Sequence, residues 1–332
     1  MDKVHVGFVG CGWFGNFHLD YLLTREDVDV VAFATGNEEK LRKTGKKASG
    51  ARLYSEAMQL IEQEEKLDAL FICVPPDRHD GIERAAAERG VHLYVEKPVG
   101  NSLDEVMKTA IALAKSDIVC AVGYQGRYDN GIQEMRTLSI QSPPYALQGH
   151  WVNEIPSSEW WRDKARSGGQ VVEQSTHLVD LMRYFAGEAV AVYGTAQNNI
   201  LPHDDARSVD DVSFATIWFQ NGALGSLVSG CFQDPALAMP SVSLRAHARD
   251  YTFTYDWFGG IKFVSRESER NYSHSGENHA RAAAAFITAV KGGDKEAVRC
   301  GYIDAMRTFI LTLAIEQAIT SGQKVLVPEL LL

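Results

Sequence analysis

The sequence predicts a two-domain α/β protein, in which a doubly wound parallel sheet precedes an α+β domain with an open, mainly antiparallel sheet. The first part of the chain alternates short β-branched runs with helical patterns, which is typical of βαβ units. After residue 123 this alternation ends, and strand patterns dominate from 190 to about 265. The 332 residues also exceed what one hydrophobic core usually holds. We therefore expect domains at residues 1–123 and 124–332, a division that allows the C-terminal helices to pack back toward the first domain.

Short apolar runs in the first domain predict the strands of the parallel sheet. These runs are Val4–Val9, Val28–Ala34, Ala69–Val74, Val91–Val95 and Ile118–Val122. Helical spacing predicts helices over Leu53–Glu64 and Asp80–Arg89, the second ended by Gly90. Ligands of such sheets bind beyond the carboxyl ends of the strands, so the residues that follow each run are candidates for a site.

The second domain is expected to combine one sheet with helices on one side. Helices are predicted near 129–139 and over 168–186, with a strand at Tyr145–Val152 between them and strands from 190 to about 265. Asn221-Gly222 separates two strand patterns and predicts a tight hairpin. Two further helices are predicted at 277–290 and 302–320.

The strand at 212–219 has large apolar residues on both faces. Phe214 and Trp218 point to one side, and Ile217 and Phe219 to the other. One face would pack on the domain's own helices, and the other would need a partner. We therefore expect a homo-oligomer, a dimer or tetramer, through this sheet.

Composition excludes several classes of function. The net charge of −10 disfavours nucleic-acid or anionic-membrane partners. No apolar run approaches the roughly 18 residues of a membrane span, and the first residues read as a strand and not as a signal peptide. The five cysteines are scattered without a CxxC pair, which favours a reducing compartment and predicts a cytoplasmic protein without disulfides.

The first strand leads into Gly10-Cys-Gly12-Trp-Phe-Gly15 and then a helical pattern. In this context a GxGxxG motif predicts dinucleotide binding. Gly10 permits the tight turn, Gly12 lets a pyrophosphate approach the backbone, and Gly15 allows close packing of helix and strand. The alternative is a glycine-rich turn without a ligand.

The end of the second strand distinguishes NAD from NADP. An acidic residue there would bind the ribose 2′-hydroxyl of NAD, but this chain has Thr35. Thr35, Asn37 and Lys40 can bind a 2′-phosphate, whereas Glu38 and Glu39 are unfavourable for one. These residues favour NADP and leave NAD open; a solvated helix face is the other interpretation of Lys40.

Two further segments contain candidate catalytic groups. Lys97, in Glu96-Lys97-Pro98, follows a strand at the predicted ligand-binding edge, although a surface Glu–Lys pair has the same pattern. In GGQVVEQSTHLVD, helical spacing places Glu173, His177 and Asp180 on one stripe. That stripe is either a solvated face or the acid–base apparatus of an active site.

The segments GCGWFG, VPPDRH, VEKPVG and GGQVVEQSTHLVDLMRYFAG, taken in order, resemble the motifs of the glucose–fructose oxidoreductase/inositol dehydrogenase/MocA (Gfo/Idh/MocA) family. The resemblance spans the chain and implies a Rossmann domain, a second α/β domain, and NAD(P)-dependent oxidation of sugars, cyclitols or related polyols. TGNEEK is also similar to the SGNxEK of glucose–fructose oxidoreductase, which uses NADP.

The resemblance assigns the catalytic lysine to Lys97 and the catalytic histidine to His177. Glu173 stands where the family usually has Asp, and Gln170 and Ser175 also depart from its pattern. His177 would accept the proton of the alcohol, Lys97 would stabilise the developing negative charge on oxygen, and Glu173 would orient the imidazole or bind a neighbouring hydroxyl. Asp180 would belong to the same stripe or pair with Arg183.

Further residues complete the set of expected ligand contacts. The cofactor is expected to contact Gly10, Gly12, Trp13, Phe14, Gly15, Thr35, Asn37, Lys40, Val74, Pro75, His79, Glu96, Lys97, Gln125, Trp161 and Arg162. The substrate is expected to contact Lys97, Arg127, Asn153, Trp160, Glu173 and His177. A core or surface role is the alternative for the two tryptophans. The histidines show no HxH or HExxH spacing, so no metal is predicted.

Three functions are compatible with these motifs. The first is a sugar or polyol dehydrogenase or reductase that acts on CH–OH groups. The second is a glycosidase that uses tightly held NAD for transient oxidation. The third is a catalytically silent dinucleotide-binding regulator, which the presence of Lys97 and His177 disfavours.

Overall fold

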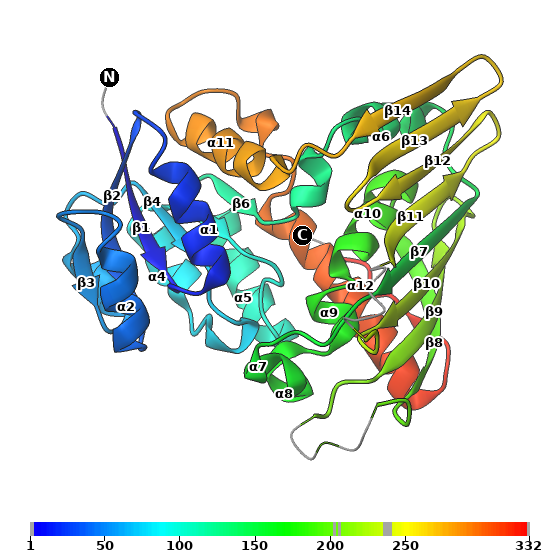
Figure 1. Ribbon diagram of the computed structural model, residues 1–332, viewed down its shortest axis with the longest axis horizontal. Helices are drawn as coiled ribbons and strands as arrows, with labels where there is room; N and C mark the ends of the chain where they lie inside the picture. Colours follow the sequence, from blue (N-terminus) through cyan, green and yellow to red (C-terminus); the bar gives the residue numbers. More distant parts are fainter. Residues whose placement is uncertain (1–2, 202–203, 205–206, 235–240, 331–332) are drawn as a thin grey trace. The chain divides into compact units, whose positions relative to one another are not determined.

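The computed structural model of the protein describes residues 3–201, 204, 207–234 and 241–330. The chain forms two compact units, one of residues 1–125 with 279–306 and the other of residues 126–278 with 307–332 (Figure 1). The first unit therefore contains a segment from near the C-terminus. Within the described residues, no helix has the length and hydrophobicity needed to cross a membrane.

The first unit has a six-stranded sheet of order β3-β2-β1-β4-β5-β6, in which every pair is parallel. Its strands are β1 (Val4–Val9), β2 (Val28–Ala34), β3 (Arg52–Tyr54), β4 (Ala69–Ile72), β5 (His92–Val95) and β6 (Cys120–Val122). Its helices are α1 (Trp13–Leu22), α2 (Glu38–Gly45), α3 (Ala57–Gln63), η1 (Pro76–Arg78), α4 (Ile82–Glu88), α5 (Leu103–Ala114), α11 (Asn278–Val290) and η4 (Lys295–Ala297). The predicted doubly wound parallel sheet is confirmed.

The strands of this sheet are buried because helices cover it. Every residue of β4 is buried, and Phe8, Phe33 and Phe71 stack across three neighbouring strands. Continuous apolar runs of this kind are typical of parallel sheets with both faces covered. One expected helix start was wrong: Leu53 lies in β3, paired with Phe33 of β2, and helix α3 begins only at Ala57.

The second unit has a nine-stranded sheet of order β14-β13-β12-β11-β7-β10-β9-β8-β15. Its strands are β7 (Ala146–Val152), β8 (Ala189–Gln197), β9 (Val212–Phe219), β10 (Leu224–Gly230), β11 (Ser241–His247), β12 (Tyr251–Asp256), β13 (Gly260–Ser265), β14 (Glu269–Ser273) and β15 (Val325–Leu326). All neighbours are antiparallel except β7 and β10. The predicted hairpin at Asn221-Gly222 joins β9 to β10, with Trp218 opposite Leu224.

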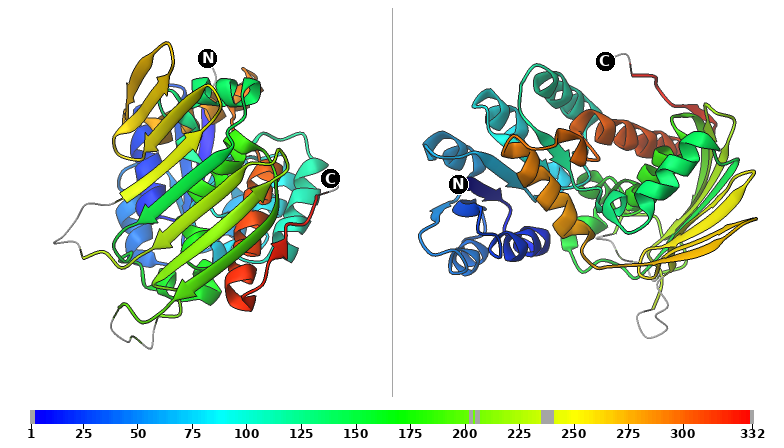
Figure 2. Two further views of the ribbon diagram at one scale, coloured as in Figure 1. Left: turned by 90° about the vertical axis from the view of Figure 1, so that its right-hand side faces the viewer. Right: turned by 90° about the horizontal axis from the view of Figure 1, so that it is seen from above.

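Helices cover one face of this sheet (Figure 2). The helices of this unit, with the connecting turns, are η2 (Gln125–Tyr128), α6 (Ile132–Gln141), α7 (Glu159–Arg162), α8 (Lys164–Ser167), α9 (Gln170–Glu173), α10 (Thr176–Ala186) and α12 (Tyr302–Ser321). Side chains of α6, α10 and α12 form one buried cluster with Ile217 and Phe219 of β9, whereas Phe214 is 53% exposed. The expectation that one face packs on the unit's own helices is confirmed.

The helix predicted over 168–186 is instead two helices, α9 and α10, separated at Gln174 and Ser175. Ser175 is completely buried, and its hydroxyl lies 2.5 Å from that of Ser229 on β10. Gln170 also donates a hydrogen bond to the carbonyl of Gly230. These contacts with β10 interrupt the helix, a tertiary effect that apolar spacing along the chain does not reveal.

Candidate functional site

The predicted cofactor residues of the first unit follow the carboxyl ends of its strands. The glycine motif follows β1, Thr35 follows β2, Val74 and Pro75 follow β4, and Lys97 follows β5. Because the strands are parallel, these segments share one edge of the sheet (Figure 1). The strand order places the change of winding direction between β1 and β4, where ligands of such sheets bind.

The glycine motif has the backbone geometry that its sequence predicts. Gly10 has φ of +98°, and a Cβ there would lie 2.5 Å from the carbonyl oxygen of Cys73. A Cβ on Gly15 would lie 2.1 Å from the carbonyl oxygen of Gly10. Gly12 has nothing within 4 Å of such a position and directly precedes α1. The loop is thus tight where it packs and open where a pyrophosphate would approach the helix N-terminus.

A pocket of about 410 Å³ lies beside this loop, between α1 and α2. Its lining includes Gly12, Lys40, Lys43 and Lys47. Asn37 caps α2 by accepting a hydrogen bond from the backbone of Lys40 at 2.9 Å. The pocket therefore combines a helix N-terminus with lysine side chains, which suits an anionic group.

His79, after β4, is buried, and its Nδ1 bonds the carboxylate of Glu83 on α4. Burial lowers the pKa of His79, but the charge and hydrogen bond of Glu83 outweigh it, so the pKa is raised. These contacts anchor the turn after β4; the expected cofactor contact of His79 remains a prediction.

Lys97 is half-buried at the end of β5, and the Lys97–Pro98 peptide bond is cis. The preceding Glu96 carboxylate is buried and accepts hydrogen bonds from His18 at 2.7 Å and from the backbone of Lys97 at 3.3 Å. A Cβ on Gly123 would lie 2.7 Å from both Glu96 oxygens. The absence of a side chain at Gly123, just after β6, therefore makes room for this carboxylate.

Two observations test whether these residues fit a dinucleotide. The open position at Gly12 leaves the backbone accessible, as described above. Gln125, after β6, is 3% exposed, and its Oε1 has no hydrogen-bond partner among the described residues. A buried polar atom of this kind normally finds a partner, which a bound ligand can supply. The residues of this sheet edge therefore fit a nicotinamide dinucleotide.

In the second unit, His177 lies at the start of α10 and contacts two tryptophans, whose rings also contact each other at 5.6 Å. Its ring stacks on Trp151 of β7 at 5.7 Å and lies 4.9 Å from the ring of Trp257, which follows β12. Trp151 in turn donates a hydrogen bond to Gln174 at 3.2 Å. The imidazole of His177 therefore packs in a cluster of three aromatic rings, with 5% of the residue exposed.

The expected stripe does not continue to Asp180. Asp180 is buried, and its carboxylate accepts two hydrogen bonds from Arg127 and one from Thr308. Arg183 binds Glu188 and Thr308. Because α9 ends at Glu173, that side chain and His177 belong to different helices. Asp180 and Arg127 therefore have structural contacts, and the expected substrate contact of Arg127 remains a prediction.

The loop with Trp160, Trp161 and Arg162 forms α7. Trp161 is 1% exposed and packs with Val209 and Cys231, with Trp160 against this cluster. Arg162 pairs with Asp204 at 3.4 Å. These contacts match the core role that was the alternative for the tryptophans. Asn153, after β7, accepts a hydrogen bond from the backbone of Glu154. The ligand contacts expected of these side chains remain predictions.

Sequence reasoning missed Trp151, Trp257 and Gln174 as parts of the His177 environment. Trp151 lies two residues before Asn153, so strand alternation alone puts both on one face. Trp257 lies next to the Phe258-Gly259-Gly260 turn, and no motif in the sequence links it to His177. Its approach to His177 depends on the pairing of β12 with β11.

The first unit has a Rossmann fold with a glycine loop, which defines a dinucleotide-binding protein. The family model described as "Oxidoreductase family, NAD-binding Rossmann fold" matches residues 4–124, and the GFO/IDH/MocA C-terminal domain matches residues 143–244. The chain belongs to the Gfo/Idh/MocA oxidoreductase family.

Three proteins similar to the chain have low sequence identity to it. It is 26% identical over 227 residues to the uncharacterized oxidoreductase YrbE of Bacillus subtilis, covering 67% of this chain and 65% of that protein. It is 25% identical over 228 residues to the myo-inositol 2-dehydrogenase of Thermotoga maritima, covering 67% of each. The levoglucosan dehydrogenase complex with NADH has a TM-score of 0.86 and 18% identity, covering 99% of this chain and 100% of that one. At that identity the likeness concerns the fold alone.

Proposed function

We propose that the protein is an NAD(P)-dependent dehydrogenase or reductase that transfers a hydride between nicotinamide C4 and a CH–OH carbon of a sugar, cyclitol or related polyol. The observation that carries the proposal is the carboxyl edge of the parallel sheet in the first unit. The glycine loop, open at Gly12, follows β1 there, and Lys97 follows β5, with β4 between the two strands. The names of the inositol and levoglucosan dehydrogenases support the class of substrate.

A bound nicotinamide would accept or donate the hydride, and the protein must move the proton. We propose His177 as the group that takes the proton from the alcohol and returns it in reduction, since a histidine works near neutral pH. Trp151, which stacks on the imidazole, and Trp257, which contacts it at a tilt, would hold the ring in one orientation. Lys97 would donate a hydrogen bond to the reacting oxygen and stabilise its negative charge. Glu173 would orient the imidazole or bind a neighbouring hydroxyl.

For the cofactor we propose NADP in preference to NAD. Thr35 stands where an acidic residue would repel a 2′-phosphate, and three lysines line the pocket between α1 and α2. Lys40, whose backbone is capped by Asn37, is the expected partner of the 2′-phosphate. The NADH of the levoglucosan dehydrogenase complex shows the other cofactor in a protein of the same fold.

A spectrophotometric screen tests the proposal. The protein is mixed with NAD⁺ or NADP⁺ and a panel of polyols, aldoses, anhydrosugars and glycosides, and both nicotinamide absorbance and released sugar are followed. Formation of reduced cofactor with at least one member supports a dehydrogenase. Sugar release without any change in absorbance would instead identify the glycosidase, and dinucleotide binding with neither reaction would identify a silent regulator.

A further inference from the structure

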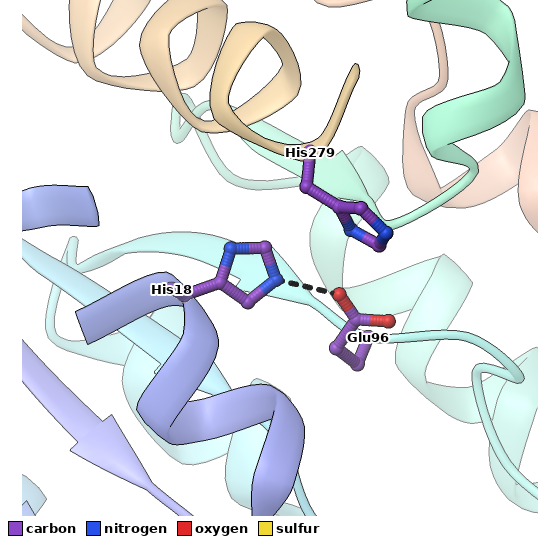
Figure 3. Close-up of side chains that lie close together, drawn as sticks. All are labelled: His18, Glu96 and His279. Carbon is purple, nitrogen blue, oxygen red and sulfur yellow. Dashed lines mark hydrogen bonds and ion pairs between the residues drawn. The ribbon is translucent and has the colours of Figure 1, made fainter. Parts of the chain in front are cut away.

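Three donor side chains from distant parts of the sequence meet inside the first unit. His18 lies on α1, Glu96 follows β5, and His279 lies at the start of α11 (Figure 3). One ligand atom of each residue lies within 4.8 Å of the other two. The group combines two imidazoles with one carboxylate, and this donor set is typical of sites for divalent transition metals.

We propose that His18, Glu96 and His279 form a binding site for one divalent transition-metal ion such as Zn²⁺ or Co²⁺. This inference concerns the first unit alone and does not depend on the proposed function. It also goes beyond the sequence analysis, which predicted no metal because no two histidines have a ligand spacing.

The distances suit an ion after a small adjustment. Metal–ligand bonds of about 2.0–2.2 Å place neighbouring ligand atoms roughly 3–4 Å apart. The Nε2 of His18 and the Oε1 of Glu96 are 2.7 Å apart and share a hydrogen bond, so an ion would replace the shared proton and separate them slightly. Rotation of His279, the least buried of the three, would complete the set.

The charge of the site favours a cation. Glu96 is 5% exposed, and its carboxylate bonds the imidazole of His18. A buried carboxylate needs a compensating positive charge, which a metal ion supplies directly. Two nitrogens and a single carboxylate are a poor set for Ca²⁺ or Mg²⁺, which prefer oxygen ligands.

Aromatic rings surround the three ligands. His18 lies 4.9 Å from Tyr94 and 5.5 Å from Phe71, and His279 lies 5.0 Å from Phe17. Such an apolar shell limits water and strengthens the attraction between an ion and its ligands. The partial exposure of His279 leaves a route of entry for an ion. The ion would join α1 and the end of β5 to α11, so its expected role is structural.

The experiment uses the full chain without a histidine tag, stripped of metal by a chelator. Calorimetry with Zn²⁺ and visible absorption with Co²⁺ measure affinity and stoichiometry, and the melting temperature is recorded against metal concentration. We expect one ion per chain, a Co²⁺ spectrum that shows nitrogen ligation, and a melting temperature that rises with metal. Mg²⁺ should reproduce none of these effects.

His279→Ala and His18→Gln should weaken binding by about tenfold or more, because each removes a ligand. The matched control is His5→Gln, since His5 also pairs with a carboxylate, Asp68 at 2.9 Å, on the same unit. It should bind Co²⁺ like the unchanged protein. If His18→Gln does not fold, the test depends on His279→Ala, because His279 is the more exposed of the two histidines. Absence of stoichiometric binding, or equal binding by folded His279→Ala, would show that the three residues form only a hydrogen-bonded cluster.

Discussion

The guanidinium of Arg127 holds the carboxylate of Asp180 with two hydrogen bonds, from Nε at 2.8 Å and from Nη2 at 2.6 Å. Both side chains are almost completely buried, and Thr308 of α12 adds a third hydrogen bond to Asp180 at 2.9 Å. Three segments of the second unit, η2, α10 and α12, are therefore joined at one carboxylate.

Removing this carboxylate should destabilise the protein strongly. In Asp180→Ala the Arg127 charge stays buried without its partner, and breaking a buried pair in this way costs about 3–5 kcal/mol. Chemical denaturation measures the change in unfolding free energy. The control is Lys262→Ala, whose pair with Glu269 is more than half exposed and should contribute less than about 1 kcal/mol. Equal effects of the two substitutions would contradict a structural role for Asp180.

The proposed acid–base pair predicts a loss of turnover without a loss of cofactor binding. His177→Ala should lower kcat by about 10²–10⁴-fold, the usual contribution of a positioned proton-transfer group. Lys97→Ala should lower kcat by about 10²–10³-fold, because it removes a donor to the developing negative charge. Steady-state kinetics and a dinucleotide titration separate the two effects. His150→Gln, which alters a β7 side chain bonded to Ser241, is the control and should keep its kcat. Full activity of Lys97→Ala would refute its assignment.

Substitution of Glu173 shows whether the proposed site works with a shorter acidic side chain. Glu173→Asp restores the residue usual in the family but withdraws the carboxylate by one methylene. We expect KM to rise while kcat stays within about tenfold, and Glu173→Ala to lower both kcat and kcat/KM. The measurement is steady-state kinetics with the substrate found in the screen. Unchanged kinetics of both variants would place Glu173 outside the reaction.

The lysine-lined pocket predicts a cofactor preference. Lys40→Glu should lower kcat/KM for NADP⁺ by more than about tenfold and change that for NAD⁺ little, because only a 2′-phosphate would meet the new negative charge. Parallel kinetics with both cofactors measure the ratio. Lys66→Glu makes the same change of charge on an exposed lysine outside the pocket and serves as the control. A stronger effect on NAD⁺ would overturn the NADP proposal.

The uncovered face of the nine-stranded sheet predicts self-association. Phe214, Tyr193 and Leu224 are 53%, 44% and 49% exposed on neighbouring strands. Phe214→Asp should convert an oligomer to a monomer, since burial of a charge opposes association. Sedimentation velocity measures the mass. Ile140→Asp, at an exposed position of α6, should leave the oligomer intact. A monomeric unchanged protein would refute the expectation.

The parts of the fold predicted from the sequence depend on local patterns. The glycine motif, the hairpin at Asn221-Gly222 and the parallel strands were readable because turn conformation, strand alternation and helix spacing involve neighbouring residues. Lys97 could be placed at the ligand-binding edge for the same reason, since it directly follows a strand.

Contacts between distant residues required the tertiary structure. The break at Ser175 arises from a hydroxyl on β10, the partner of Asp180 lies on η2, and His18 meets His279 because α11 belongs to the first unit. None of these has a fixed spacing along the chain. Buried polar groups take whichever partners the packed elements bring to them, so their roles depend on topology and not on local sequence.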